Sequence, residues 1–118
     1  MTRQFSFGFF VCGDTGEIYE AEALEEILDN LMAVMVAREN NLVFDSSVGA
    51  VLAEAYVDID VAVTADAEAT AAHLARDFVA EAIREIGGTP VGFFVFEPNE
   101  PDRAPQVWHE RKSELVSV

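Results

Sequence analysis

The chain has 118 residues, and its 22 acidic and seven basic residues give a formal net charge of −15 at pH 7. This length is typical of one domain, and an apolar share of 51% argues against intrinsic disorder. Nucleic acids and anionic membranes bind cationic surfaces, so the charge argues against direct binding to either.

The N-terminal segment and the cysteine content indicate a cytoplasmic protein. Arg3 precedes a short apolar run without a small-residue cleavage site, so we expect no signal peptide. No apolar run reaches the roughly 20 residues that a membrane-spanning helix requires. Cys12 is the one cysteine and cannot form an internal disulfide, which fits a reducing compartment. We expect it to be a buried, small apolar side chain.

The first predicted strand covers residues 5–13. Its residues alternate between two sets, which is the period of a strand with one face toward a core. The core set is Phe5, Phe7, Phe9 and Val11, and the opposite set is Ser6, Gly8, Phe10 and Cys12. Gly8 weakens a strand unless another group approaches it closely. Turn-forming residues at 13–16 end the strand.

The first predicted helix covers residues 17–38. Apolar residues recur along it at helical spacing; they are Ala21, Leu24, Ile27, Leu28, Leu31 and Met35. Asn40 and Asn41 end the helix. Two interpretations of the next segment stay open: residues 42–52 form one bulged strand, or residues 48–53 form the strand after a connection at 42–44.

The clearest strand covers residues 55–64. Its alternation places Val57, Ile59, Val61 and Val63 on one face and Tyr56, Asp58, Asp60, Ala62 and Thr64 on the other. A second helix begins after an N-cap at Thr64 or Asp66 and runs to Ile86, where Gly87 and Gly88 end it. The last predicted core strand covers residues 91–96.

The end of the chain differs in composition from the rest. Pro98, Pro101 and Pro105 interrupt it, and the residues that follow include the one tryptophan, Trp108. We therefore assign residues 1–97 to a single α+β domain. Residues 98–118 form a Pro-punctuated C-terminal tail, which we expect to dock on the sheet or on a partner subunit.

The order of these elements is strand, helix, strand, strand, helix, strand. With right-handed crossovers, the simplest arrangement is a ferredoxin-like βαββαβ sandwich. It has a four-stranded antiparallel sheet in the order 4-1-3-2, two helices on one face and the C-terminal tail.

Large apolar side chains are expected on the face of this sheet that the helices leave uncovered. Phe10 lies there beside Tyr56 if the other phenylalanines of the first strand face the helices. The candidate interface residues are Phe10, Tyr56, Phe94, Phe96 and Trp108. Uncovered apolar patches mark interfaces, so we expect a homodimer that packs these faces together. In the alternative, the tail covers the face within one chain, with Trp108 as the plug.

Three explanations stay open for the acidity: solubility, adaptation to a salt-rich environment, or a surface that docks on a basic partner protein. The candidate acidic face consists of Glu22, Glu25, Glu26, Asp29, Asp58 and Asp60. Carboxylates in such rows can also imitate the phosphates of a nucleic acid, so mimicry of nucleic acid is a sharper form of the third explanation.

The sequence predicts no catalytic residue, metal site or cofactor. His73 lies at the boundary of a helix stripe, and His109 lies in the tail, where it can approach a partner subunit. No nucleophile elbow, phosphate-binding loop or paired-cysteine site is present. Asp58 and Asp60 are two carboxylates, whereas Ca²⁺ takes six or more oxygens.

We therefore predict a small, acidic, self-associating protein-interaction module for which a basic protein is a candidate partner. The alternative is a dimeric α+β-barrel-like enzyme or small-ligand-binding protein with a cavity lined by sheet aromatics.

Overall fold

The computed structural model describes residues 2–13, 16–91 and 106–116. Its elements are β1 (Thr2–Gly13), α1 (Ala21–Arg38), β2 (Val43–Val51), a 3-10 turn (Leu52–Glu54), β3 (Tyr56–Thr64), α2 (Glu68–Glu85), β4 (Gly88–Val91) and β5 (Gln106–Val116). Neither α1 nor α2 is long and apolar enough to cross a membrane.

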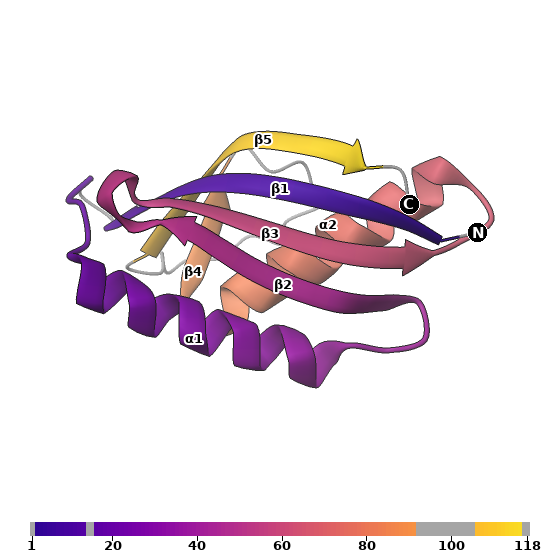
Figure 1. Ribbon diagram of the computed structural model, residues 1–118, viewed down its shortest axis with the longest axis horizontal. Helices are drawn as coiled ribbons and strands as arrows, with labels where there is room; N and C mark the ends of the chain where they lie inside the picture. Colours follow the sequence, from indigo (N-terminus) through magenta and orange to yellow (C-terminus); the bar gives the residue numbers. More distant parts are fainter. Residues whose placement is uncertain (1, 14–15, 92–105, 117–118) are drawn as a thin grey trace.

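The strands form one five-stranded sheet in the order β2-β3-β1-β5-β4, with both helices on the same face (Figure 1). The pairs β2–β3, β3–β1 and β1–β5 are antiparallel, and the pair β5–β4 is parallel. The predicted α+β class is confirmed, and the first six helices and strands follow the predicted βαββαβ order.

The predicted four-stranded antiparallel sheet is wrong. Residues 106–116, assigned to the tail from the sequence, form β5, which lies between β1 and β4. It pairs with β1 from Gln106 opposite Gly13 to Val116 opposite Gln4. The inserted strand turns the expected order 4-1-3-2 into 4-5-1-3-2 and adds the parallel pair.

The boundaries of the other elements decide between the open interpretations. β2 is one strand with an irregularity between Phe44 and Ser47, where Asp45 has a φ of 52°. The bulged strand is therefore confirmed. Gly87 follows α2 with a φ of 89°, as a glycine that ends a helix does. Of the predicted strand at 91–96, Val91 belongs to β4 and the remainder lies outside the described residues.

The core lies between the sheet and the two helices. Alternate residues of β1 and β3 are buried there, namely Phe5, Phe7, Phe9, Val11, Val57, Ile59, Val61 and Val63. They pack against the apolar stripes of the helices, which include Leu24, Leu31, Met35, Ala75, Val79 and Ile83. This burial is the main stabilising contribution to the fold.

Trp108 is a core residue in this structure. Its side chain is fully buried and lies edge-on to Phe9, with ring centroids 5.7 Å apart. A Cβ atom on Gly88 would lie 2.6 Å from Trp108 Nε1 and 2.7 Å from Ile83, so the glycine is needed for this packing. Trp108 therefore lies on the helix side of the sheet and not over its uncovered face.

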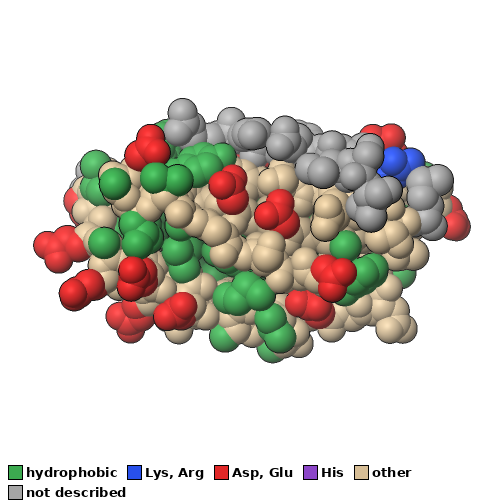
Figure 2. All heavy atoms as spheres, in the orientation of Figure 1, with side chains coloured by type: hydrophobic (Ala, Val, Ile, Leu, Met, Phe, Trp, Pro, Cys, Tyr) green, Lys and Arg blue, Asp and Glu red, His purple; other side chains and the backbone are tan. Residues whose placement is uncertain are grey.

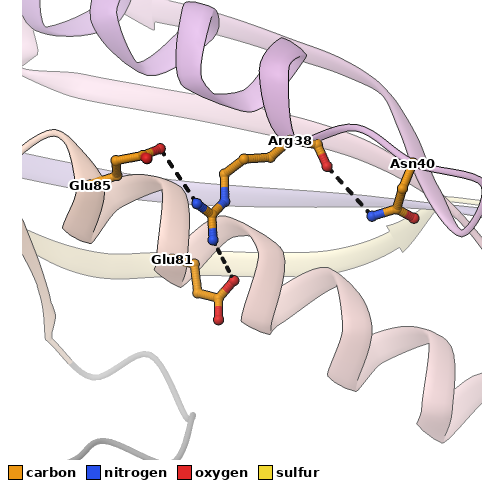
Figure 3. Close-up of polar contacts among 4 residues, drawn as sticks. All are labelled: Arg38, Asn40, Glu81 and Glu85. Carbon is orange, nitrogen blue, oxygen red and sulfur yellow. Dashed lines mark hydrogen bonds and ion pairs between the residues drawn. The ribbon is translucent and has the colours of Figure 1, made fainter.

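Arg38 joins the two helices at the end of α1 (Figure 3). Its guanidinium group donates a hydrogen bond to Glu81 at 2.8 Å and lies 3.5 Å from Glu85. The bond to Glu81 raises the pKa of Arg38 above its usual value. One cation thus neutralises two carboxylates that would otherwise repel each other one helical turn apart.

We expect Arg38→Gln to lower the free energy of unfolding by about 1 kcal/mol at low salt, because the pairs are largely exposed. The difference should shrink in molar salt, which screens the two carboxylates. Urea denaturation followed by Trp108 fluorescence measures it. Arg38→Lys is the control, because it keeps the charge. Equal stability of Arg38→Gln and the wild type at low salt would contradict the prediction.

Candidate interaction surface on the open face of the sheet

The open face is the side of β1 and β3 that points away from α1 and α2. It consists of Ser6, Gly8, Phe10 and Cys12 of β1 and Tyr56, Asp58, Asp60, Ala62 and Thr64 of β3. These residues alternate with the buried core residues, so strand geometry alone places them there.

Two aromatic side chains lie together at one end of this face. The Phe10 ring is 37% exposed and lies edge-on to the half-buried Tyr56, with ring centroids 6.1 Å apart. The Tyr56 hydroxyl group lies over Gly8, where a Cβ atom would collide with it. Tyr56 therefore covers the glycine of the neighbouring strand, which is the close approach that offsets the weakening of a strand by glycine.

The strand register extends this pair into a row across four strands. His109 of β5 lies opposite Phe10, and Val51 of β2 lies opposite Tyr56. His109 is exposed, and Val51 is 44% exposed. Figure 2 shows hydrophobic side chains close together at the left end of the molecule and acidic side chains spread over its surface. This end of the open face is an apolar surface of the kind that interfaces use.

The carboxylates of β3 lie next to the aromatic pair. Asp58 is flanked in the register by Gly8 and Gly49, and nothing lies within 4 Å of the position that a Cβ on Gly49 would take. Asp60 lies opposite Ser47, whose hydroxyl group donates to it at 3.5 Å. Both aspartates are half-buried. The open face therefore combines an aromatic end with an acidic middle.

The six residues of the predicted acidic face lie on two sides of the sheet. Asp58 and Asp60 are on the open face, whereas Glu22, Glu25, Glu26 and Asp29 are exposed on α1, which covers the other side. The structure brings together the members within each group but does not join the two groups on one surface.

Of the remaining predicted interface residues, only Trp108 falls within the described residues. Trp108 is in the core, and Phe94 and Phe96 lie outside the described residues. Cys12 is half-buried on the open face and lies opposite Val107, which is buried. The expected small apolar role of Cys12 fits this position, although the side chain is not fully buried.

The histidines and acidic residues do not form a metal centre in the described part of the chain. His73 is exposed on α2, and its Nε2 atom lies 3.0 Å from Asp77. Among the described residues, no three His, Cys, Asp or Glu side chains are grouped so that they could hold a metal ion.

Comparison of the chain with protein-family models, with curated proteins and with solved structures found no match. The open face is therefore interpreted from its own geometry.

We expect Gly8→Ala to lower the free energy of unfolding by about 1–3 kcal/mol, because the added methyl group displaces Tyr56. Gly49→Ala, on the same face, is the matched control. It meets open space and should be neutral or stabilising by up to about 1 kcal/mol. Urea denaturation of both variants measures the difference. Equal effects would show that Tyr56 does not cover Gly8.

Proposed function

We propose that this protein is a small, acidic, non-catalytic interaction module that binds a basic protein partner. The observation that carries the proposal is the open face, where exposed Phe10 and half-buried Tyr56 lie beside Asp58 and Asp60. Aromatic residues are typical of the centre of protein interfaces, and carboxylates beside them select a partner with lysine or arginine. The net charge of −15 supports the proposal by steering basic partners toward the protein.

Affinity capture from host lysate with matched charge variants tests this function. We expect the wild type to retain a defined protein at low salt and to release it in molar salt, because screening weakens the attraction. Asp58→Asn combined with Asp60→Asn should lose that protein. Glu22→Gln combined with Glu26→Gln removes the same charge from α1 and should keep it. Equal capture by both double variants would show that net charge alone is responsible.

We also propose self-association through the aromatic end of the open face. Phe10, Tyr56 and Val51 form the apolar part of the row, and a two-fold axis near them would bury this part against itself. Because this axis lies at the aromatic end and not in the middle of the face, Asp58 and Asp60 of the two copies stay apart.

Light scattering on a sizing column, at low and at molar salt, tests self-association. We expect a dimer that is favoured in molar salt, because salt screens the repulsion between two copies of charge −15. Phe10→Ser should shift the mass toward the monomer, and Val36→Ser, which changes an exposed apolar residue of α1, should not. A wild-type monomer at both salts would contradict self-association.

The enzyme or ligand-binding alternative rests on His109, which lies opposite Phe10 on the exposed row. A melting-temperature screen against small molecules separates it from the proposed function, because a bound ligand stabilises the folded state.

A further inference from the structure

The edge of the sheet formed by β2 divides into a closed half and an open half. In the closed half, the Val43 carbonyl group accepts a hydrogen bond from Asn40 N–H at 2.8 Å. The backbone N–H groups of Asp45 and Ser46 donate to the Glu39 carboxylate at 3.2 and 3.3 Å. The bulge and Glu39 thus occupy the outward backbone groups at the start of the strand.

The open half is Ser47–Val51, and the register shows which of its backbone groups point outward. Val11 N–H donates to Ala55 C=O, so odd-numbered residues of β3 bond toward β1 and even-numbered residues toward β2. The even-numbered Tyr56, Asp58 and Asp60 pair with Val51, Gly49 and Ser47. Val48 and Ala50 therefore direct their N–H and C=O groups away from the sheet.

In the described part of the chain, this open half lacks the usual protection of an edge strand. Natural edges carry charges, prolines or covering segments that prevent pairing with another chain. Residues 46–53 contain no charged residue and no proline. Within the open half, Ser47, Gly49, Ala50 and Val51 are exposed, and Val48 is half-buried.

A carboxylate lies on the helix side of this edge. Arg38 faces α2 (Figure 3), whereas Glu39 faces the bulge of β2, so the side of α1 that bears Glu39 is the side toward β2. At about 100° per residue, Glu25 lies roughly 40° around the helix axis from Glu39, on the same side. The N-terminal half of α1, which includes Glu25, runs beside the C-terminal half of β2, because the two elements run in opposite directions (Figure 1).

A further carboxylate lies on the open-face side of the edge. Asp58 is on the strand behind Gly49, and the space above Gly49 is open. A strand added next to β2 would lie about 10 Å from β3, since neighbouring strands are roughly 4.8 Å apart. A lysine or arginine side chain lying over Gly49 spans most of that separation and brings its cation to Asp58.

We infer that the Ser47–Val51 edge binds an extended, lysine- or arginine-rich segment of a partner protein by strand addition. The inference rests on the proposed function and specifies how the basic partner is held. Backbone groups of Val48 and Ala50 pair with the added strand. Its side chains alternate between Glu25 of α1 and Asp58 on the open face.

A second copy of this chain is a poorer occupant of the same edge. Two-fold pairing of β2 with β2 would bring Glu25 of both copies to one interface. Each copy also carries a charge of −15, and like charges brought together oppose association. A cationic strand instead meets opposite charge on both of its sides.

The test uses a short fluorescent peptide of consecutive lysine residues, which carries cations on both faces of an extended strand, with binding followed by anisotropy at low salt. Ala50→Pro removes an outward N–H group without removing a bond to β3. We expect it to weaken binding roughly tenfold, since the loss of one or two hydrogen bonds is involved. Ala50→Val keeps the N–H group and should bind like the wild type. Trp108 fluorescence verifies that each variant is folded.

A second arm changes the peptide and leaves the protein unchanged. Methylation of alternate backbone nitrogens along the pairing edge of the peptide should abolish binding, and a peptide of consecutive glutamate residues should not bind. Glu25→Gln should weaken binding of the lysine peptide and reduce its salt dependence.

The outcomes separate this inference from the proposed function. Equal binding by Ala50→Pro and Ala50→Val, with loss in Asp58→Asn, would overturn strand addition and leave basic-partner binding to the open face intact. Equal binding of methylated and unmethylated peptide would also overturn it. A lower native mass of Ala50→Pro than of Ala50→Val without peptide would show that a second copy occupies the edge. If wild-type protein does not distinguish the lysine peptide from the glutamate peptide, the inference is wrong, while lysate capture still decides the proposed function.

Discussion

Burial of one side of β1 and β3 against the two helices is the constraint on which the other features depend. Core residues at every second position of β1 and β3 are at most 2% exposed, namely Phe7, Phe9, Val57 and Ile59. Because successive side chains point to opposite faces, burying these residues forces Phe10, Tyr56 and Asp58 outward. The surface that we interpret as functional is therefore the direct complement of the core.

The pairing of charged side chains differs between the two sides of the sheet. On the helix side, cations are used internally: Arg38 joins α1 to α2, and Arg76 lies over the Phe7 ring and 3.4 Å from Glu110. On the open face, Asp58 and Asp60 lie beside aromatic rings. Among the described residues, no basic side chain forms an ion pair with either aspartate. Half-buried carboxylates in such a setting favour a cationic partner, because contact with one excludes water and strengthens the attraction.

Local periodicity predicted most of the fold, and long-range pairing accounts for what it missed. The alternation at 57–63 and the helical stripe of α1 are properties of short segments, so the sequence alone predicts them. β5 was not, because Pro98, Pro101 and Pro105 precede it and residues 109–112 read as a polar tail. Its strand character depends on pairing with β1. The outward positions of Phe10 and Tyr56 were likewise predictable, but the closed half of the β2 edge depends on Glu39, whose contact with Asp45 crosses a turn that sequence alone does not define.

The position of β5 also determines the order in which the sheet can be completed. Phe9 of β1 lies opposite Val57 of β3 on one side and opposite Glu110 of β5 on the other. β1 precedes both strands in the chain and β5 follows β3, so β1 receives its second neighbour last. Contacts so distant along the chain slow folding. A chain emerging from the ribosome therefore holds a phenylalanine-rich strand with one unpaired edge until residues 106–116 follow. During that interval, mutual repulsion between strongly anionic chains opposes the pairing of such edges with one another.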